Sequence, residues 1–243
     1  MRFTSKTSRN GVNEQLFILG EIPGVLWTPE GAAGTRPLIL LGHGGGQHKL
    51  APAIVAGAVR LVTERGYAVA AADAPNHGDR PKDEKFLRLV AETRARVAAG
   101  DDAASAFDTV HTLLAEQSVP EWQSVVTELQ DLDYVNTGPV GYRGMSLGCG
   151  LGMPFVAAEP RVRAAVLGLF GSPSLVQTAS RIAVPVQFLV QWDDELVPRA
   201  ASLAVFDALA SPDKTLHANA GLHADVPEFE VDSSLEFFAR HLG

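Results

Sequence analysis

The sequence predicts an α/β fold built on a doubly wound, mostly parallel sheet of about eight strands that is flanked by helices. Short apolar runs recur along the chain and are bounded by turn residues. These runs are continuously apolar rather than alternating, which is typical of parallel strands covered on both faces. Segments with helical periodicity separate them, and strands that alternate with helices form α/β sheets.

The expected strands follow one another along most of the chain. The apolar runs that predict them lie at 24–27, 37–43, 67–73, 138–144, 163–171 and 185–192, and "KTLHANA" around residue 217 predicts one more. The helical patterns between and after them lie at 51–65, 148–158, 200–209 and 232–242. Each helix therefore has a strand before it, as in a doubly wound sheet.

The connection from Gly78 to Asn136 is too long for a simple crossover. It carries two apolar helical stripes, and Ser118 to Glu121 then predicts a capping box with Pro at the start of a third helix. We therefore expect a helical insertion at about 80–117, after strand four, which either roofs a pocket or thickens one flank of the sheet. No Pro/Gly/Ser-rich linker sets it apart, so we expect one domain over 1–243.

Composition excludes several classes of protein. The net charge is −8 with no basic run, which argues against a nucleic-acid or anionic-membrane partner. No stretch of about 18 apolar residues predicts a membrane span, and one cysteine allows no internal disulfide. The polar first 20 residues lack the apolar core of a signal peptide, so we expect a soluble cytoplasmic protein.

The stretch "GPVGYRGMSLGCG" places Ser146 among five glycines, directly after an expected strand. Residues 144–148 match G-x-S-x-G, the strained strand-to-helix turn that exposes a nucleophilic serine and needs small neighbours. The same glycines would also let a helix pack closely on a sheet. Only partners elsewhere in the chain can separate these two interpretations.

A nucleophilic serine needs a histidine base and a carboxylate that orients it, in the chain order serine, acid, histidine for this turn. Of the three later histidines, His217 lies in an expected strand and His241 in the last helix. His223 lies in the loop between them and is our candidate base. The run "QWDDELVP" supplies the acid, with Asp194 favoured over Asp193.

An acyl-transfer site also needs main-chain N–H groups that stabilise the oxyanion. Leu147, directly after the serine, supplies one donor, and the glycines of "LLGHGGGQHK" supply another, with Gly45 favoured and Gly44 beside it. This loop fits neither a dinucleotide-binding G-x-G-x-x-G nor a P-loop. His43 and His48 have no carboxylate or cysteine at ligand spacing, so we expect a loop role and no metal.

With these parts in this order, the chain resembles the α/β-hydrolase superfamily, and within it the small serine esterases of the dienelactone-hydrolase-like group. The segments that carry the resemblance are "HGGGQHK", "DAPNHGDR", "GMSLG", "DELVP" and "GLH". The resemblance implies an acyl-enzyme mechanism on a small-molecule ester, no cofactor, and a homodimer as a common state. The dienelactone hydrolases themselves use a cysteine nucleophile; here Cys149 is expected to be a packed thiol, and Asp73 and His77 are expected to hold loops together.

The substrate is less sharply predicted than the reaction. Met145, Trp192 and Leu196 are candidate pocket residues, which indicates a small to medium, partly apolar acyl substrate. The same triad would serve a thioesterase, a lactonase or a carbon–carbon bond hydrolase. A non-catalytic, ligand-binding member of the fold is the remaining alternative, whereas an aspartate-nucleophile hydrolase would need Asp where Ser146 stands.

Overall fold

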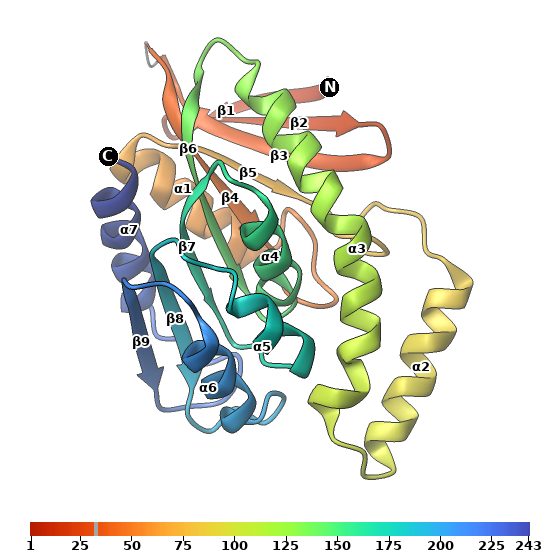
Figure 1. Cartoon of the computed structure of the whole chain (residues 1–243). Coiled ribbons are helices and arrows are strands. Elements are labelled where there is room, and N and C mark those ends of the chain that lie inside the picture. Colours follow the sequence, from red (N-terminus) through yellow and green to blue (C-terminus); the bar gives the residue numbers. More distant parts are fainter. Residues whose placement is uncertain (32–33) are drawn as a thin grey trace.

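The computed structural model describes residues 1–31 and 34–243, and within them nine strands form one mixed sheet (Figure 1). The order across the sheet is β1-β2-β3-β5-β4-β6-β7-β8-β9. The strands are β1 Arg2–Arg9, β2 Val12–Leu19, β3 Ile22–Pro29, β4 Arg36–Gly42, β5 Ala68–Ala72, β6 Val135–Met145, β7 Val162–Gly168, β8 Val186–Gln191 and β9 Lys214–Asn219. From β5 to β9 every neighbouring pair is parallel, as predicted, and β1, β2 and β3 are antiparallel.

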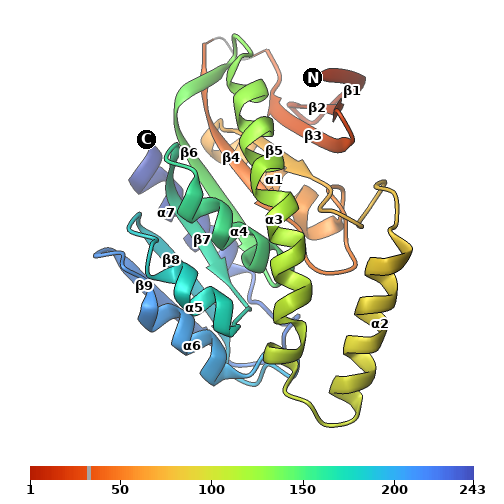
Figure 2. The same ribbon diagram turned by 45° about the vertical axis from the view of Figure 1, so that its right-hand side comes forward.

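Helices cover both faces of this sheet (Figures 1 and 2). Those over the described chain are α1 Pro52–Arg65, α2 Glu84–Ala98, α3 Ala103–Gln130, α4 Leu147–Ala158, α5 Pro173–Ala179, α6 Arg199–Ala208 and α7 Phe229–Leu242. One buried cluster lies under α1 and α7, and another joins the opposite face to α3, α4 and α5. The doubly wound α/β architecture predicted from the sequence is confirmed.

Two N-terminal strands, β1 and β2, were not expected from the sequence. Seven of the eight β1 residues are exposed, so the strand has no apolar run to reveal it. The turn between the strands is Asn10-Gly11, and both residues have positive φ, 53° and 79°, which is the signature of a tight hairpin. With these two strands the described sheet has nine strands rather than about eight, and the strand before the helical insertion is β5 rather than the expected strand four.

The insertion contains α2 and α3, and the expected helix break at Ser118–Pro120 is wrong. α3 runs through Pro120 as one 28-residue helix, and Ser118 is buried within it instead of capping a new one. A proline inside a helix costs about 3 kcal/mol. Apolar side chains on both sides of Pro120, among them Leu114, Trp122 and Val126, are buried, and each contributes about 1.5–3 kcal/mol when fully buried. Packing therefore outweighs the local cost.

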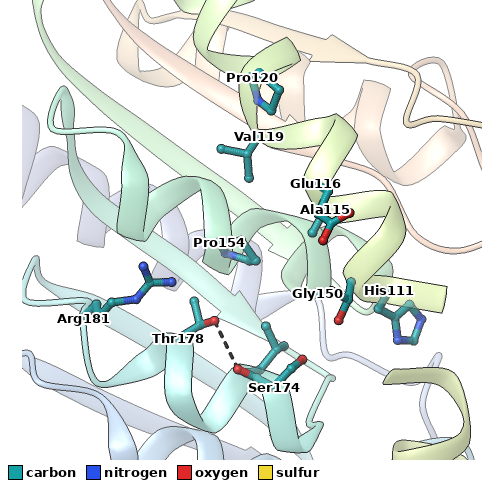
Figure 3. Close-up of a pocket in the computed structure, with 12 residues that line it drawn as sticks. His111, Ala115, Glu116, Val119, Pro120, Gly150, Pro154, Ser174, Thr178 and Arg181 are labelled. Atoms are coloured by element: carbon teal, nitrogen blue, oxygen red, sulfur yellow. Dashed lines mark hydrogen bonds between the residues drawn. The ribbon is translucent and has the colours of Figure 1, made fainter. Parts of the chain in front are cut away.

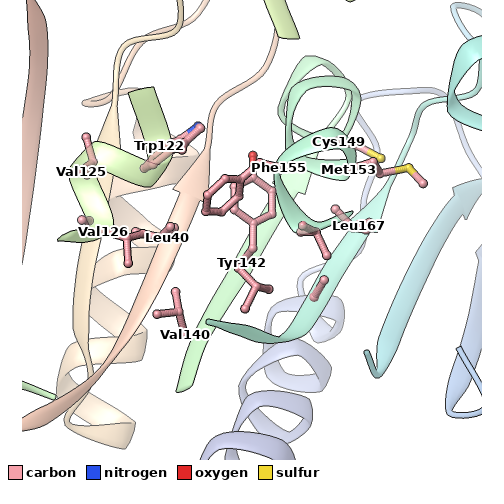
Figure 4. Packing of buried hydrophobic residues seen from close by; sticks show 14 of the residues in the cluster. Leu40, Trp122, Val125, Val126, Val140, Tyr142, Cys149, Met153, Phe155 and Leu167 are labelled. Carbon is pink, nitrogen blue, oxygen red and sulfur yellow. The ribbon is translucent and has the colours of Figure 1, made fainter. Parts of the chain in front are cut away.

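Glycines let α4 lie against the centre of the sheet, as predicted. A Cβ on Gly148 would overlap the main chain of Gly42, and one on Gly152 would overlap the ring of Tyr142. Tyr142 is fully buried beside Trp122 and Phe155 (Figure 4), and its hydroxyl donates to the carbonyl of Gly148 at 2.7 Å. This packing places the first turn of α4, and Ser146 before it, at the carboxyl ends of β4 and β6.

Across residues 1–31 and 34–243, no helix is both long enough and apolar enough to cross a membrane.

Candidate active site

Ser146 stands on the sharp turn between β6 and α4. Its backbone angles are φ 54° and ψ −125°, a conformation that costs a non-glycine residue roughly 1–3 kcal/mol. The turn is held because the N–H of Ser146 donates to the carbonyl of Gly168 at 3.0 Å, and the carbonyl of Ser146 accepts from Cys149 and Gly150 of α4. The turn places Ser146 directly after the carboxyl end of β6 and before the first residue of α4.

The hydroxyl of Ser146 meets the imidazole of His223. Ser146 Oγ lies 3.0 Å from His223 Nε2, and His223 Nδ1 lies 2.7 Å from Asp194 Oδ2. A carboxylate only accepts, so Nδ1 carries the imidazole proton and Nε2 is free to accept from the serine hydroxyl. The structure thus brings the three predicted residues into one hydrogen-bonded chain.

Asp194 is held rigidly in the loop after β8. Its side chain is 3% exposed, and its second oxygen, Oδ1, accepts the N–H groups of Leu196 and Val197, each at 2.8 Å. Asp193 points elsewhere, toward the N–H of Gly221 at 3.4 Å. Of the two candidate acids, Asp194 is therefore the one that reaches the imidazole.

The other two later histidines lie outside this cluster. His217, in β9, contacts Glu230 of α7 through Nδ1 at 2.8 Å, and His241 in α7 lies 3.6 Å from Asp213. Both positions agree with the strand and helix predicted for them. Neither histidine contacts Ser146.

Two of the three candidate oxyanion donors lie together. Leu147 is the first residue of α4, and N–H groups in a first helical turn have no intrahelical acceptor. A Cβ on Gly45 would lie 3.9 Å from Cβ of Leu147, and the N–H of Gly45 has no hydrogen-bond partner among the described residues. The N–H of Gly44, in contrast, donates to Gln47 Oε1 at 3.3 Å, so it is already engaged.

His43 orients the peptide group that carries the N–H of Gly45. The main-chain N–H of Ala74 donates to His43 Nε2 at 3.0 Å, so Nδ1 carries the proton and donates to the carbonyl of Gly44 at 2.9 Å. That carbonyl and the Gly45 N–H belong to one planar peptide. Burial lowers the pKa of His43 to about 4, so the ring is neutral at physiological pH.

A buried ion pair ties the same loop to the one after β5. Lys49 Nζ lies 2.8 Å from Asp73 Oδ2, and the carboxylate of Asp73 also accepts the N–H groups of Lys49 and Asp79. Burial is the largest single influence on Asp73 and would raise its pKa, but the hydrogen bonds and charge of Lys49 and the N–H of Asp79 together outweigh burial and hold this pKa below its ordinary value. Asp73 therefore holds the loops together, as predicted. His77 hydrogen-bonds within its own loop, to the carbonyl of Pro75 at 2.8 Å, and its ring centroid lies 5.4 Å from that of His43 in the other loop.

Cys149 is a packed thiol, as predicted. Its side chain is fully buried, and burial raises its pKa to about 12. A thiol with so high a pKa has almost no thiolate at neutral pH, and the thiolate is the nucleophilic form. Cys149 is therefore not a candidate nucleophile.

The three predicted pocket residues lie in different surroundings. Met145 is half-buried and packs against the cluster under α1 and α7. Trp192 is 47% exposed, and Cζ of Arg199 lies 4.0 Å from the centroid of its indole ring. Leu196 is 59% exposed. Their role in binding substrate stays a prediction.

A cavity of about 390 Å³ lies between α3, α4 and α5 (Figure 3). Gly150 lines it one helical turn after Ser146, and His111, Ala115 and Pro154 line it as well. His111 is wedged between the rings of Phe107 and Phe170, at 5.8 and 4.6 Å, and burial lowers its pKa to about 4. The insertion thus walls a cavity beside α4, and the three residues of the hydrogen-bonded chain do not line it.

No cluster of three or more His, Cys, Asp or Glu side chains suited to a metal ion occurs in the part of the chain that the structure describes. Sequence reasoning missed the role of Lys49, whose ammonium pairs with the carboxylate of Asp73 in another loop, and that of Glu195, which accepts the main-chain N–H of His223. A single charged residue in a loop belongs to no sequence pattern from which such a contact could be predicted.

Comparisons with known proteins agree with the fold. A family model described as the dienelactone hydrolase family matches residues 23–222. A cold-adapted esterase from an Arctic intertidal metagenomic library, solved as a complex with PEG, is 30% identical over 100% of both chains, with a TM-score of 0.83. The acetyl xylan esterase from Paenibacillus sp. R4 has a TM-score of 0.71 at 15% identity, over 99% of this chain and 88% of its own, which shows the fold alone. The search of curated proteins gives no match.

Proposed function

The chain belongs to the dienelactone hydrolase family, and we propose that it is a serine hydrolase that cleaves carboxylic esters through an acyl-enzyme intermediate. The observation that carries the proposal is the continuous hydrogen-bonded chain from Ser146 Oγ through His223 to Asp194, with links of 3.0 and 2.7 Å. The esterase that is 30% identical over its full length supports the choice of ester bonds.

The reaction begins when Ser146 Oγ attacks the ester carbonyl. His223 Nε2 takes the hydroxyl proton, and Asp194 supports the imidazolium that forms. The N–H groups of Gly45 and Leu147 donate to the developing oxyanion; such donors are each worth about 3–4 kcal/mol of transition-state stabilisation when judged by deletion. The alcohol leaves with the proton from His223, and the acyl group stays on Ser146.

Water then completes the cycle. His223 removes a proton from water as it attacks the acyl carbonyl, and the proton returns to Ser146 Oγ when the acid leaves. The residues in this account need no cofactor. The exposed Trp192 and Leu196 beside the acid loop favour a small to medium, partly apolar ester as the substrate.

Hydrolysis of a p-nitrophenyl ester series, from acetate to decanoate, tests the proposal with the wild type and Ser146→Ala side by side. The expected result is turnover by the wild type that falls by at least about a thousandfold in the variant. The acyl chain length that gives the highest turnover then indicates the size of the acyl site. A folded wild type that hydrolyses none of the esters would contradict the proposal, and thioester or lactone substrates would then be the next probes.

A further inference from the structure

Three consecutive carboxylates after β8 all contact the loop that carries His223. Asp193 accepts the N–H of Gly221 at 3.4 Å, and Asp194 accepts His223 Nδ1 at 2.7 Å. Glu195 Oε2 accepts the main-chain N–H of His223 at 2.8 Å. The acid next to Asp194 is therefore bonded to the same histidine, through a different atom.

The bond to Glu195 matters because the histidine loop has little regular structure of its own. No helix or strand covers residues 220–227, and the side chain of Leu222, next to His223, is 50% exposed. The main chain at Leu222 is held by Gln191 Nε2 at 3.1 Å and by Asp225 at 3.0 Å. Glu195 holds the main chain at His223 itself.

The two contacts divide the placement of the imidazole between them. Asp194 sets the rotation of the ring through Nδ1, while Glu195 sets the position of the main chain from which the ring extends. A shift of that main chain changes the distance from Nε2 to Ser146 Oγ even if the Asp194 contact follows the ring. Displacements of about 1 Å at such a centre cost up to about a hundredfold in rate.

We propose that Glu195 is a positioning residue of the hydrolase, which clamps the main chain of His223 so that Nε2 stays within reach of Ser146. The inference rests on the proposed function for its effect on rate. Its structural part, the clamp on the loop, stands on the observed bond. A carboxylate accepts a charge-assisted hydrogen bond from N–H, which is stronger than a bond between neutral groups. Glu195 is exposed, so solvent reduces the strength of this bond.

Asp193 offers a matched control on the same loop. It is also an exposed carboxylate, but its contact is longer and reaches Gly221, two residues before the histidine. Glu195→Gln supplies the second comparison, because its amide oxygen still accepts the N–H of His223 and only the charge is lost.

The experiment measures kcat and KM for p-nitrophenyl acetate in Glu195→Ala, Glu195→Gln and Asp193→Ala. We expect Glu195→Ala to lose on the order of tenfold in kcat with KM within about twofold. Glu195→Gln should recover kcat to within about threefold of the wild type, and Asp193→Ala should lose no more than that. Equal losses in the Ala and Gln variants, or a Glu195→Ala variant as active as the wild type, would overturn the proposal.

Amide hydrogen exchange provides a readout that does not depend on turnover. The His223 amide should exchange faster in Glu195→Ala than in the wild type, with no such change in Asp193→Ala. Unchanged exchange would overturn the clamp. A wild type that cleaves no ester would refute the proposed function instead, while the exchange comparison would still decide the role of Glu195.

Discussion

Two regions meet at Ser146, and they are held in different ways. The sheet edge, which carries Ser146, Asp194 and His223, is fixed by hydrogen bonds of 2.7–3.0 Å with defined donors and acceptors. The insertion of α2 and α3 reaches the first turn of α4 through an apolar cluster that includes Val110, Leu114 and Leu147. Directional bonds specify positions closely, whereas apolar contacts tolerate repacking. The comparison indicates that side chains are positioned most precisely at the sheet edge, where the proposed reaction takes place.

The largest effect that would test this comparison is expected at Asp194. Asp194→Asn keeps the size of the side chain but allows the other imidazole tautomer, so we expect kcat to fall by on the order of 10³–10⁴. Steady-state kinetics on p-nitrophenyl acetate measures the loss. Asp193→Asn is the control, and a loss of similar size in that variant would show that the two carboxylates are not distinguished as described.

A second, smaller effect is expected at His43. In His43→Asn the amide nitrogen lies near the position of Nδ1 and can still donate to Gly44, whereas in His43→Gln the amide lies near Nε2 and serves only Ala74. Because the Gly44 bond orients the Gly45 N–H, we expect Gln to lower kcat by roughly ten- to a hundredfold and Asn by clearly less. Equal kcat values in the two variants would contradict this role of His43.

Substitutions in the insertion are expected to change the free energy of unfolding rather than kcat. Burial lowers the pKa of His111 from 6.5 to about 4, so the unfolded chain takes up a proton between these values while the folded chain does not. The contribution of the neutral ring to the free energy of unfolding is fully present above pH 6.5 and is lost as the pH falls toward 4. The loss is at most about 1.4 kcal/mol for each unit by which the pKa is lowered. Urea unfolding of His111→Phe between pH 7 and 4.5 should show a smaller loss than the wild type. Equal losses would mean that His111 is not held neutral.

The smallest effect is expected at the polar link between the insertion and α5. Ser174 Oγ donates to Asp108 Oδ1 at 2.6 Å, and the N–H of Ser174 donates to the same oxygen at 3.3 Å. Asp108→Ala should lower the free energy of unfolding by about 1 kcal/mol and change kcat by less than about twofold. Urea unfolding and ester kinetics on the same preparation measure both. A large loss of kcat would contradict the comparison, because it would mean that the reaction also depends on the exact position of the insertion.

The sheet edge was the more predictable of the two regions. Chain order and position at the carboxyl ends of strands suffice to single out Ser146 and His223, because parallel strands bring their carboxyl ends to one edge. They favour Asp194 but leave its neighbour Asp193 open, and the choice between the two depends on loop geometry. The contacts of His43, Lys49 and Glu195 were not predictable in the same way. Each joins a side chain to a group in another loop, which is main chain for His43 and Glu195 and the Asp73 carboxylate for Lys49. The partner depends on loop geometry rather than on residue type.

The insertion and the N-terminal hairpin show where sequence patterns fail. Pro120 carries a strong local signal for a helix start, yet buried side chains on both sides keep α3 continuous. β1 is so exposed that its alternation is weak, and only pairing with β2 makes it a strand. In both cases tertiary packing overrides the local preference.

The central claim is that Ser146 is an activated nucleophile. Mass spectrometry of the protein treated with a fluorophosphonate tests it most directly, since covalent labelling needs both the hydroxyl and its base. The account predicts one adduct per chain on the peptide that contains Ser146, and its loss in His223→Ala. An unlabelled but folded wild type, or a label on any other residue, would contradict it.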